Sequence, residues 1–174
     1  MAAAFPINLS PRQFGQRHIA DRIAGIVAQA GVPPSMIELE ITESTLMQRT
    51  DQTLATLDRL HGLGHALAID DFGIGYSSLA YLKRFPVDQL KIDQSFVHDI
   101  AVDPANAAIV SAVVALADSL GLEVVAEGVE TLEQLDAVRR CGCRQAQGFI
   151  FSPAVPAAEV RGLRGEPRTV PLNA

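Results

Sequence analysis

The chain has 174 residues, which is the size of one ordinary domain and leaves no room for a second hydrophobic core. Hydrophobic residues make up 48% and charged residues 20%, so we expect a well-buried core. The formal net charge is -6, and no run of Lys and Arg appears, which argues against duplex DNA or RNA as a partner. No apolar stretch is long enough for a signal peptide or a membrane span.

Short β-branched or apolar runs alternate with segments that repeat their apolar residues at helical spacing. Six runs are predicted strands: 6–9, 37–42, 66–70, 89–93, 123–127 and 146–151. Helical spacing appears over 19–30, 54–60 and 109–120. Several strands are too uniformly apolar to have one wet face, which favours a parallel sheet covered by helices. After about residue 160 the periodicity is lost, so we expect a flexible tail there.

Polar residues lie at or just past the predicted carboxyl end of each strand. They are Asn8, Glu40, Glu43, Asp70, Asp71, Lys91, Asp93, Glu127, Glu130 and Gln147. In a β/α barrel such residues converge on one mouth, whereas in an open sheet they spread along a line. Strand ends that each carry an ionisable or amide group fit a ring better than a line.

Carboxylates at one mouth repel one another strongly unless cations neutralise them. All-oxygen donors with an Asn carbonyl suit Mg²⁺ or Mn²⁺, and the adjacent Asp70 and Asp71 allow one carboxylate to bridge two ions. Lys91 among these acids can position a water, an arrangement that suits attack on a phosphate ester. Each acidic residue taken singly is more simply a solvated or helix-capping group, and only the joint pattern favours a metal site.

Cys141 and Cys143 have no second Cys or His pair to complete a zinc site. A disulfide framework is equally unsupported, so we expect reduced, packed thiols and a cytoplasmic chain. The histidines lack partners at ligand spacing and are predicted at the surface: His18, His61, His65 and His98.

Six strings in order resemble the EAL family of cyclic di-GMP phosphodiesterase domains. They are NLSPRQF (8–14), ELEITES (38–44), DDFGIGYSSL (70–79), KIDQSF (91–96), AEGVET (126–131) and QGF (147–149). The resemblance implies an incomplete TIM-type β/α barrel with about six of eight strands, over residues 6–160, between a leader at 1–5 and the tail at 161–174. Ile74 stands where the family usually has Thr.

The resemblance also implies two-metal hydrolysis of cyclic di-GMP to linear pGpG. Asn8, Glu40 and Asp70 match metal ligands, with Asp70 bridging two Mg²⁺ or Mn²⁺ ions. The second ion is assigned to Asp71 and Glu127, and Asp93 is grouped with the ligands. Catalytic roles fall to Lys91, which holds the attacking water, with Glu127 and Gln147; control of the loop 71–79 falls to Glu43 and Glu130.

The Glu-Ala-Leu string that names the family occurs nowhere in the sequence. Because a complete barrel takes about 250 residues, we expect an amino-truncated domain that hydrolyses weakly or not at all. The truncation also predicts bare strand edges at both ends of the sheet, hence a homo-oligomer that covers them. In the full protein an upstream sensory or GGDEF-type domain is possible.

A second hypothesis is a non-catalytic module that binds cyclic di-GMP or regulates a partner. The other matched ligands are intact, which favours descent from an enzyme over a binding module with scattered ligand losses.

Overall fold

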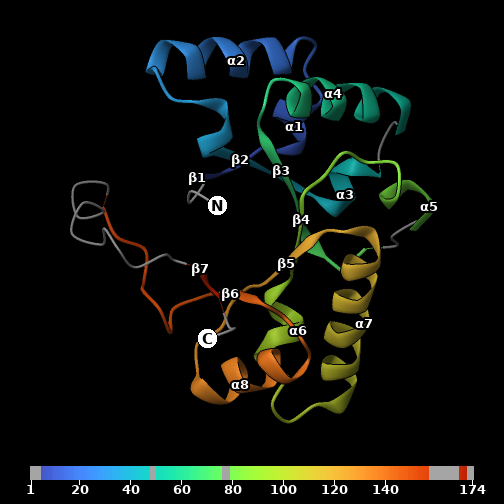
Figure 1. Ribbon diagram of the computed structural model, residues 1–174, viewed down its shortest axis with the longest axis vertical. Coiled ribbons are helices and arrows are strands. Elements are labelled where there is room, and N and C mark those ends of the chain that lie inside the picture. Colours follow the sequence, from blue (N-terminus) through green and yellow to red (C-terminus); the bar gives the residue numbers. More distant parts are fainter. Residues whose placement is uncertain (1–4, 48–49, 76–78, 157–168, 172–174) are drawn as a thin grey trace. The chain divides into compact units, whose positions relative to one another are not determined.

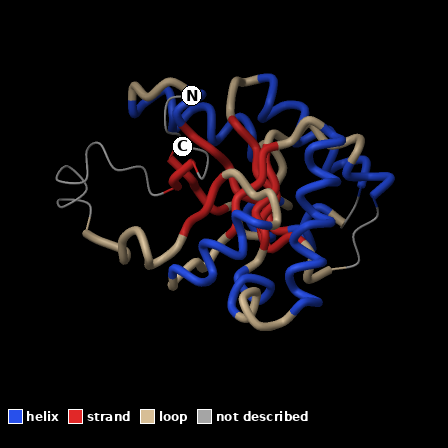
Figure 2. Tube along the Cα trace, turned by 60° about the horizontal axis from the view of Figure 1, so that its bottom comes forward, coloured by secondary structure: helices blue, strands red, loops and turns tan. Residues whose placement is uncertain are grey.

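The computed structural model describes residues 5–47, 50–75, 79–156 and 169–171 (Figure 1). The chain forms two compact units, one from Met1 to Gln89 and the other from Leu90 to Ala174. Strands and helices alternate along both of them (Figure 2).

The first unit contains three strands with their connecting helices. In chain order its elements are β1 (Phe5–Asn8), α1 (Pro11–Phe14), α2 (Ile19–Ala30), the 3-10 helix η1 (Pro34–Met36), β2 (Ile37–Thr42), α3 (Glu43–Leu46), α4 (Thr50–Gly62), β3 (Ala66–Phe72) and α5 (Leu79–Leu82). Strand β2 lies between β1 and β3 and pairs with both in parallel. A parallel pair needs a crossover, and the helices between the strands supply it.

The alternation of side chains along these strands separates a core face from a polar face. Leu39 pairs with Leu67, and Ile41 pairs with Ile69, so these four side chains share one face of the sheet. All four are at most 1% exposed. Helix α4 lies against β3 and buries its Leu57 and Leu60, so the apolar face is the core of this unit.

The second unit begins within β4. Its elements are β4 (Gln89–Ile92), α6 (Gln94–His98), α7 (Pro104–Leu120), β5 (Glu123–Ala126), α8 (Leu132–Arg140), β6 (Gln145–Gln147) and β7 (Thr169–Pro171). Strands β5 and β6 form a parallel pair, and β6 and β7 form an antiparallel pair. Helices α6, α7 and α8 contact one another, and α7 packs on β5.

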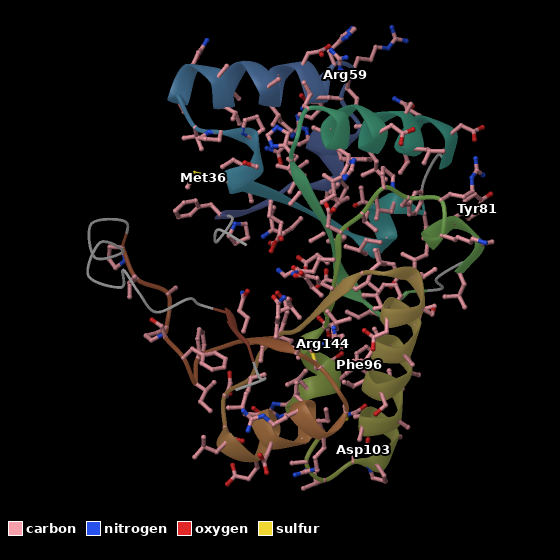
Figure 3. All side chains as sticks on the ribbon, in the orientation of Figure 1. Met36, Arg59, Tyr81, Phe96, Asp103 and Arg144 are labelled. Carbon is pink, nitrogen blue, oxygen red and sulfur yellow. The ribbon has the colours of Figure 1, made fainter. Side chains whose placement is uncertain are left out.

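Local sequence signals define the ends of the helices in this unit. Asp103 caps α7 by accepting a hydrogen bond from the Ala105 N–H at 2.8 Å (Figure 3). Thr131 and Gln134 form a capping box at the start of α8. Gln134 also donates to the carbonyl of His98 at 3.0 Å, which ties α8 to the end of α6.

Each predicted strand is present, and the bounds of β2 agree with the prediction. Strand β6 is shorter than predicted, because it ends at Gln147 and the apolar residues 148–151 form turns. The predicted tail contains a strand, β7, whose residues carried no periodic signal. Strand β6 is therefore paired on both sides, and the expectation that it forms a bare edge is wrong.

Both cysteines are free thiols. Cys143 is 2% exposed and its thiol donates to the carbonyl of Gln145 at 3.1 Å. Burial raises the pKa of the Cys143 thiol to about 11, because the thiolate is poorly solvated there. Cys141, at the end of α8, is half-buried, with its sulfur 3.5 Å from the carbonyl oxygen of Ala107. Within the described residues, no helix is long and apolar enough to cross a membrane.

His65 corrects the prediction that all four histidines lie at the surface. It precedes β3 and is only 2% exposed. Neither ring nitrogen has a hydrogen-bond partner among the described residues. Burial lowers the pKa of His65 below its ordinary 6.5, and the nearby backbone of Pro34 and Ile37 opposes this shift without a hydrogen bond of proper geometry. The imidazole is therefore held neutral.

The buried His65 makes the stability of the chain depend on pH. The unfolded chain takes up a proton on this ring near its ordinary pKa of 6.5, whereas the folded chain resists protonation. We expect the free energy of unfolding in urea to fall as the pH drops below 6.5. His65→Leu should reduce that fall, and His98→Gln, at an exposed ring, should leave it unchanged. An unaltered pH profile in His65→Leu would contradict this account.

Candidate functional site

The predicted site residues divide between the two units, and each group is described by itself. The first unit holds Asn8, Glu40, Glu43, Asp70 and Asp71, and the second holds Lys91, Asp93, Glu127, Glu130 and Gln147.

Strand register places three of the predicted ligands on one face of the sheet in the first unit. Asn8 pairs directly with Glu40 across β1 and β2. Glu40 pairs with Ala68 on β3, and Asp70 follows Ala68 by two residues, so its side chain points to the same face. This is the face opposite the leucine and isoleucine core. The polar face therefore lies at the carboxyl ends of three consecutive parallel strands.

The donors on this face suit a hard divalent cation. Glu40 is 3% exposed, Asp70 is half-buried and Asn8 is exposed. An amide carbonyl and two carboxylates are the oxygen ligands that Mg²⁺ and Mn²⁺ take. Among the described residues, no group of three or more His, Cys, Asp and Glu side chains forms a metal site by itself. Asn8 would add an amide oxygen to the two carboxylates of this face.

Asp71 has a left-handed backbone, with φ of 54°. Its N–H donates to the carboxylate of Asp70 at 3.1 Å. In a regular strand Asp71 would point away from the face that carries Asp70, and a left-handed residue breaks that alternation. Two successive carboxylates can thus serve the same edge of the sheet, at a cost of about 1–2 kcal/mol for the backbone.

Glu43 holds the loop that follows Asp71. Its side chain is 2% exposed, and Oε2 accepts a hydrogen bond from the Gly73 N–H at 2.9 Å. A Cβ on Gly75 would lie 2.9 Å from Oε1 of Glu43, so the loop backbone packs directly on the carboxylate. Residues 76–78 of the predicted loop lie outside the described residues.

A buried ion pair lies at the centre of the second group. The Lys91 Nζ is 2.6 Å from Oε1 of Glu127, and the two side chains are 4% and 19% exposed. Lys91 is on β4, and Glu127 follows β5 directly. The Glu127 N–H donates to the Ile92 carbonyl at 3.1 Å, which fixes the backbone of this pair. Removing either partner would break this buried ion pair, which costs several kcal/mol.

The turn after Glu127 requires glycine because two backbones approach closely. Gly128 has φ of 70°, and a Cβ there would lie 2.5 Å from the Cβ of Gln94. Val129 donates from its N–H to the Gln147 carbonyl at 3.0 Å. A Cβ on Gly148 would overlap the backbone of Val129. The turn after β5 and the end of β6 therefore form one tightly packed unit.

The remaining predicted residues have different surroundings. Asp93 is 8% exposed and caps α6, accepting from the Ser95 N–H at 2.8 Å. This is the capping role that a single acidic residue was expected to have. Glu130 is exposed, and its N–H donates to the Gln134 side chain at 2.7 Å. Gln147 is half-buried at the end of β6.

Sequence reasoning quoted Gly128 and Gly148 within motifs but gave neither a role. A glycine directly after a predicted site residue at a strand end was the available signal, since it marks a close approach of backbones.

Comparison with known proteins gives the class of protein. The EAL domain family matches residues 2–154. The bifunctional diguanylate cyclase/cyclic di-GMP phosphodiesterase MucR of Pseudomonas aeruginosa is 45% identical over 154 residues, which cover 88% of this chain and 22% of that protein. The cyclic di-GMP phosphodiesterase NbdA of the same organism is 45% identical over 152 residues, which cover 87% of this chain and 19% of that protein. The chain spans about a fifth of the length of these relatives.

Solved structures agree with this class. The PaMucR phosphodiesterase in complex with cyclic di-GMP has a TM-score of 0.87 at 44% identity, covering 90% of this chain and 64% of that chain. BlrP1 of Klebsiella pneumoniae, in complex with manganese and cyclic di-GMP, has a TM-score of 0.80 at 39% identity. The match covers 86% of this chain and 38% of that chain. The chain belongs to the EAL domain family. The predicted fold, an incomplete TIM-type β/α barrel with six strands, β1 to β6, is confirmed.

The contact between Gly148 and Val129 gives a direct stability test. Gly148→Ala should destabilise the chain by about 2 kcal/mol or more, because the new methyl group overlaps backbone that is hydrogen-bonded. Gly25→Ala is the matched control, since Gly25 lies in α2 with open space around it. That control should stabilise the chain by about 0.5–1 kcal/mol. Chemical denaturation measures both, and equal effects would refute the packing described here.

Proposed function

We propose that this chain is a cyclic di-GMP phosphodiesterase domain that hydrolyses cyclic di-GMP to linear pGpG. Membership of the EAL family supports this, as do the two P. aeruginosa relatives whose names include that activity. The observation that carries the proposal is the strand register that puts Asn8, Glu40 and Asp70 on one face. An acidic face of this kind cannot hold an anionic substrate without cations.

Two divalent ions, Mg²⁺ or Mn²⁺, are the proposed cofactors. Asn8, Glu40 and Asp70 would hold one ion. Asp70 is also assigned to the second ion, together with Asp71 and Glu127. Asp93 stays a proposed metal ligand in addition to its capping role. The donors are oxygens throughout, and BlrP1 has been solved with manganese. Bound ions would lower the pKa of a water and neutralise charge on the phosphate.

Lys91 is proposed to orient the attacking water. Its ammonium group donates hydrogen bonds and is held in place by Glu127 at 2.6 Å. A buried, fixed donor of this kind loses little conformational entropy when the water binds. Attack at phosphorus forms one P–O bond and breaks the bond to the ribose 3′ oxygen, which takes a proton. Gln147, tied to the same turn through its carbonyl, is proposed to support this geometry.

Glu43 is proposed as a positioning residue for the loop after Asp71, and Glu130 as a second one. The Glu43 hydrogen bond to Gly73 supports the first of these roles. The loop begins at a proposed metal ligand, so a shift in the loop would move Asp71.

Incubation with cyclic di-GMP and Mn²⁺, followed by chromatography for pGpG, tests the proposed reaction. We expect slow formation of pGpG that requires the metal ion. Glu40→Gln should abolish it, because the amide removes a charged ligand. Lys91→Ala and Glu127→Gln should lower turnover far more than they weaken binding measured by calorimetry.

The outcomes of this assay separate the two functional hypotheses. Binding without product would favour a non-catalytic cyclic di-GMP-binding module. The absence of both binding and product would reject the proposed function. A variant at Lys91 that keeps its full rate would remove that residue from the mechanism.

A cytoplasmic location is proposed because both cysteines are free thiols. Duplex nucleic acid is not a proposed partner, given the net charge of -6.

A homo-oligomer is proposed to cover strand β1, which ends the strand order of the sheet. Phe5 and Ile7 on this strand are 55% and 44% exposed. An edge strand with apolar side chains is a surface that pairs readily with another chain. The opposite end of the order is β7, which covers β6.

Light scattering at low protein concentration tests the oligomer. We expect at least a dimer, and Ile7→Lys should dissociate it, because a charge on an edge strand opposes pairing. Ile26→Lys is the control, since Ile26 is 63% exposed on α2, away from the strand edge. A stable monomer, or dissociation by both variants alike, would contradict pairing through β1.

A further inference from the structure

Phe149 is an exposed aromatic residue with a firmly held backbone. It is 68% exposed, whereas the apolar residues after it, Ile150 and Phe151, are half-buried. Exposing a large aromatic ring forgoes the free energy of its burial. What distinguishes Phe149 from other exposed apolar residues is its place at a strand end.

The turn that carries Phe149 is fixed on both sides of the ring. Gly148 packs on the backbone of Val129, and the Ile150 N–H donates to the Val129 carbonyl at 3.1 Å. The Phe151 N–H donates to the Gly148 carbonyl, also at 3.1 Å. Val129 itself is fully buried. Phe149 thus projects from a backbone with little freedom to move.

This turn lies at the same edge of the sheet as the Lys91–Glu127 pair. Strands β5 and β6 are parallel, so the residues just after each strand lie at the same edge. Glu127 follows β5, and Phe149 stands two residues after Gln147, the last residue of β6. The hydrogen bond from Val129 to Gln147 joins the two turns.

We propose that Phe149 stacks on a guanine base of the dinucleotide and so contributes to the choice of a purine-containing substrate. This inference rests on the proposed function. Cations and Lys91 serve the phosphates, but a neutral base needs an apolar, planar surface. An aromatic ring on a fixed backbone provides such a surface, and base–aromatic stacking is sequence-tolerant because every base has a π-face.

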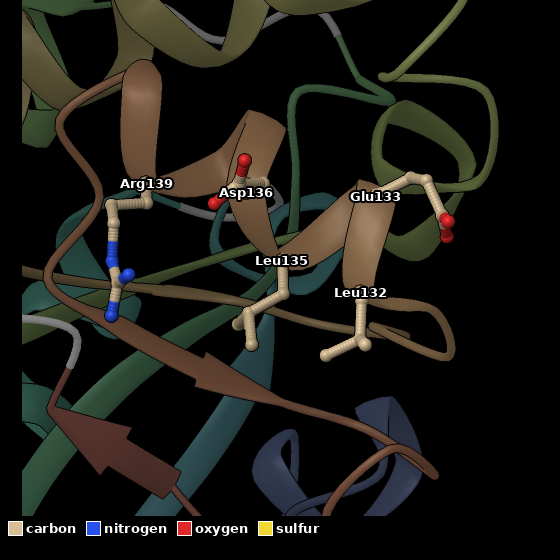
Figure 4. Close-up of a pocket in the computed structure, with 5 residues that line it drawn as sticks. All are labelled: Leu132, Glu133, Leu135, Asp136 and Arg139. Atoms are coloured by element: carbon tan, nitrogen blue, oxygen red, sulfur yellow. The ribbon is translucent and has the colours of Figure 1, made fainter.

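Leu132 is the matched control for exposure in the same unit. It is 71% exposed on α8 and lines a shallow hollow with Glu133, Leu135, Asp136 and Arg139 (Figure 4). That hollow contains none of the predicted site residues. The helix places Leu132 after Thr131, whereas Phe149 follows the end of a strand.

The sequence contains no tryptophan, so one indole can report on stacking directly. Phe149→Trp should show fluorescence quenched by cyclic di-GMP in the presence of Ca²⁺, the ion in a solved BlrP1 complex with cyclic di-GMP, and Leu132→Trp should show no change. Calorimetry on the same proteins provides the binding constants. Relative to the unaltered chain, Phe149→Ala should weaken binding about tenfold. Phe149→Tyr should keep most of the affinity, and Leu132→Ala should keep all of it.

The two levels of the proposal fail in different ways. If the unaltered chain shows no heat of binding with cyclic di-GMP, the proposed function fails and this inference with it. If the unaltered chain binds but Phe149→Ala binds equally well, or the indole at 149 is not quenched, the stacking inference is overturned and the proposed function stands. Quenching at 149 together with weaker binding by Phe149→Ala would support it.

Discussion

Strand register is the constraint on which the rest of this structure depends. Because Leu39 and Ile41 on β2 pair with Leu67 and Ile69 on β3, the intervening Glu40 has to lie on the opposite face. A slip of one residue would bury the carboxylates against the helices and expose the leucines. The free energy that holds the apolar core therefore also fixes the polar face. The proposed ligands need no separate device to bring their strands into register.

The second unit uses close backbone packing for the same purpose. Val129 lies two residues after Glu127. Its backbone packs against Gly148, and its N–H donates to the carbonyl of Gln147. The Lys91 side chain is buried and that of Glu127 is partly buried. In such surroundings an ion pair is stronger than in water but costly to form. Such a pair keeps a single geometry only if its backbone is rigid. The glycine contacts provide that rigidity.

The sequence predicted the elements that rely on periodicity and missed those that rely on contacts. Strand β2 has its predicted bounds because apolar residues alternate with polar ones along it. The sequence predicts a strand over the apolar run after Gln147, because no pattern in one chain reveals that Gly148 meets Val129. The buried place of His65 also came from tertiary packing. Of the site, the ligand face followed from the strand ends, whereas the cap formed by Asp93 needed the observed start of α6.

The left-handed backbone of Asp71 limits which sequences can occupy this position. Most side chains are strained at a φ of 54°, and among neutral residues Asn and Gly tolerate it best. Of these only Asn also keeps the shape of the side chain. The backbone conformation therefore restricts this position, and the proposed metal-ligand role would restrict it further to a charged residue. A descendant that lost the chemistry while keeping the fold would be expected to drift first to Asn, a change that a single nucleotide can make.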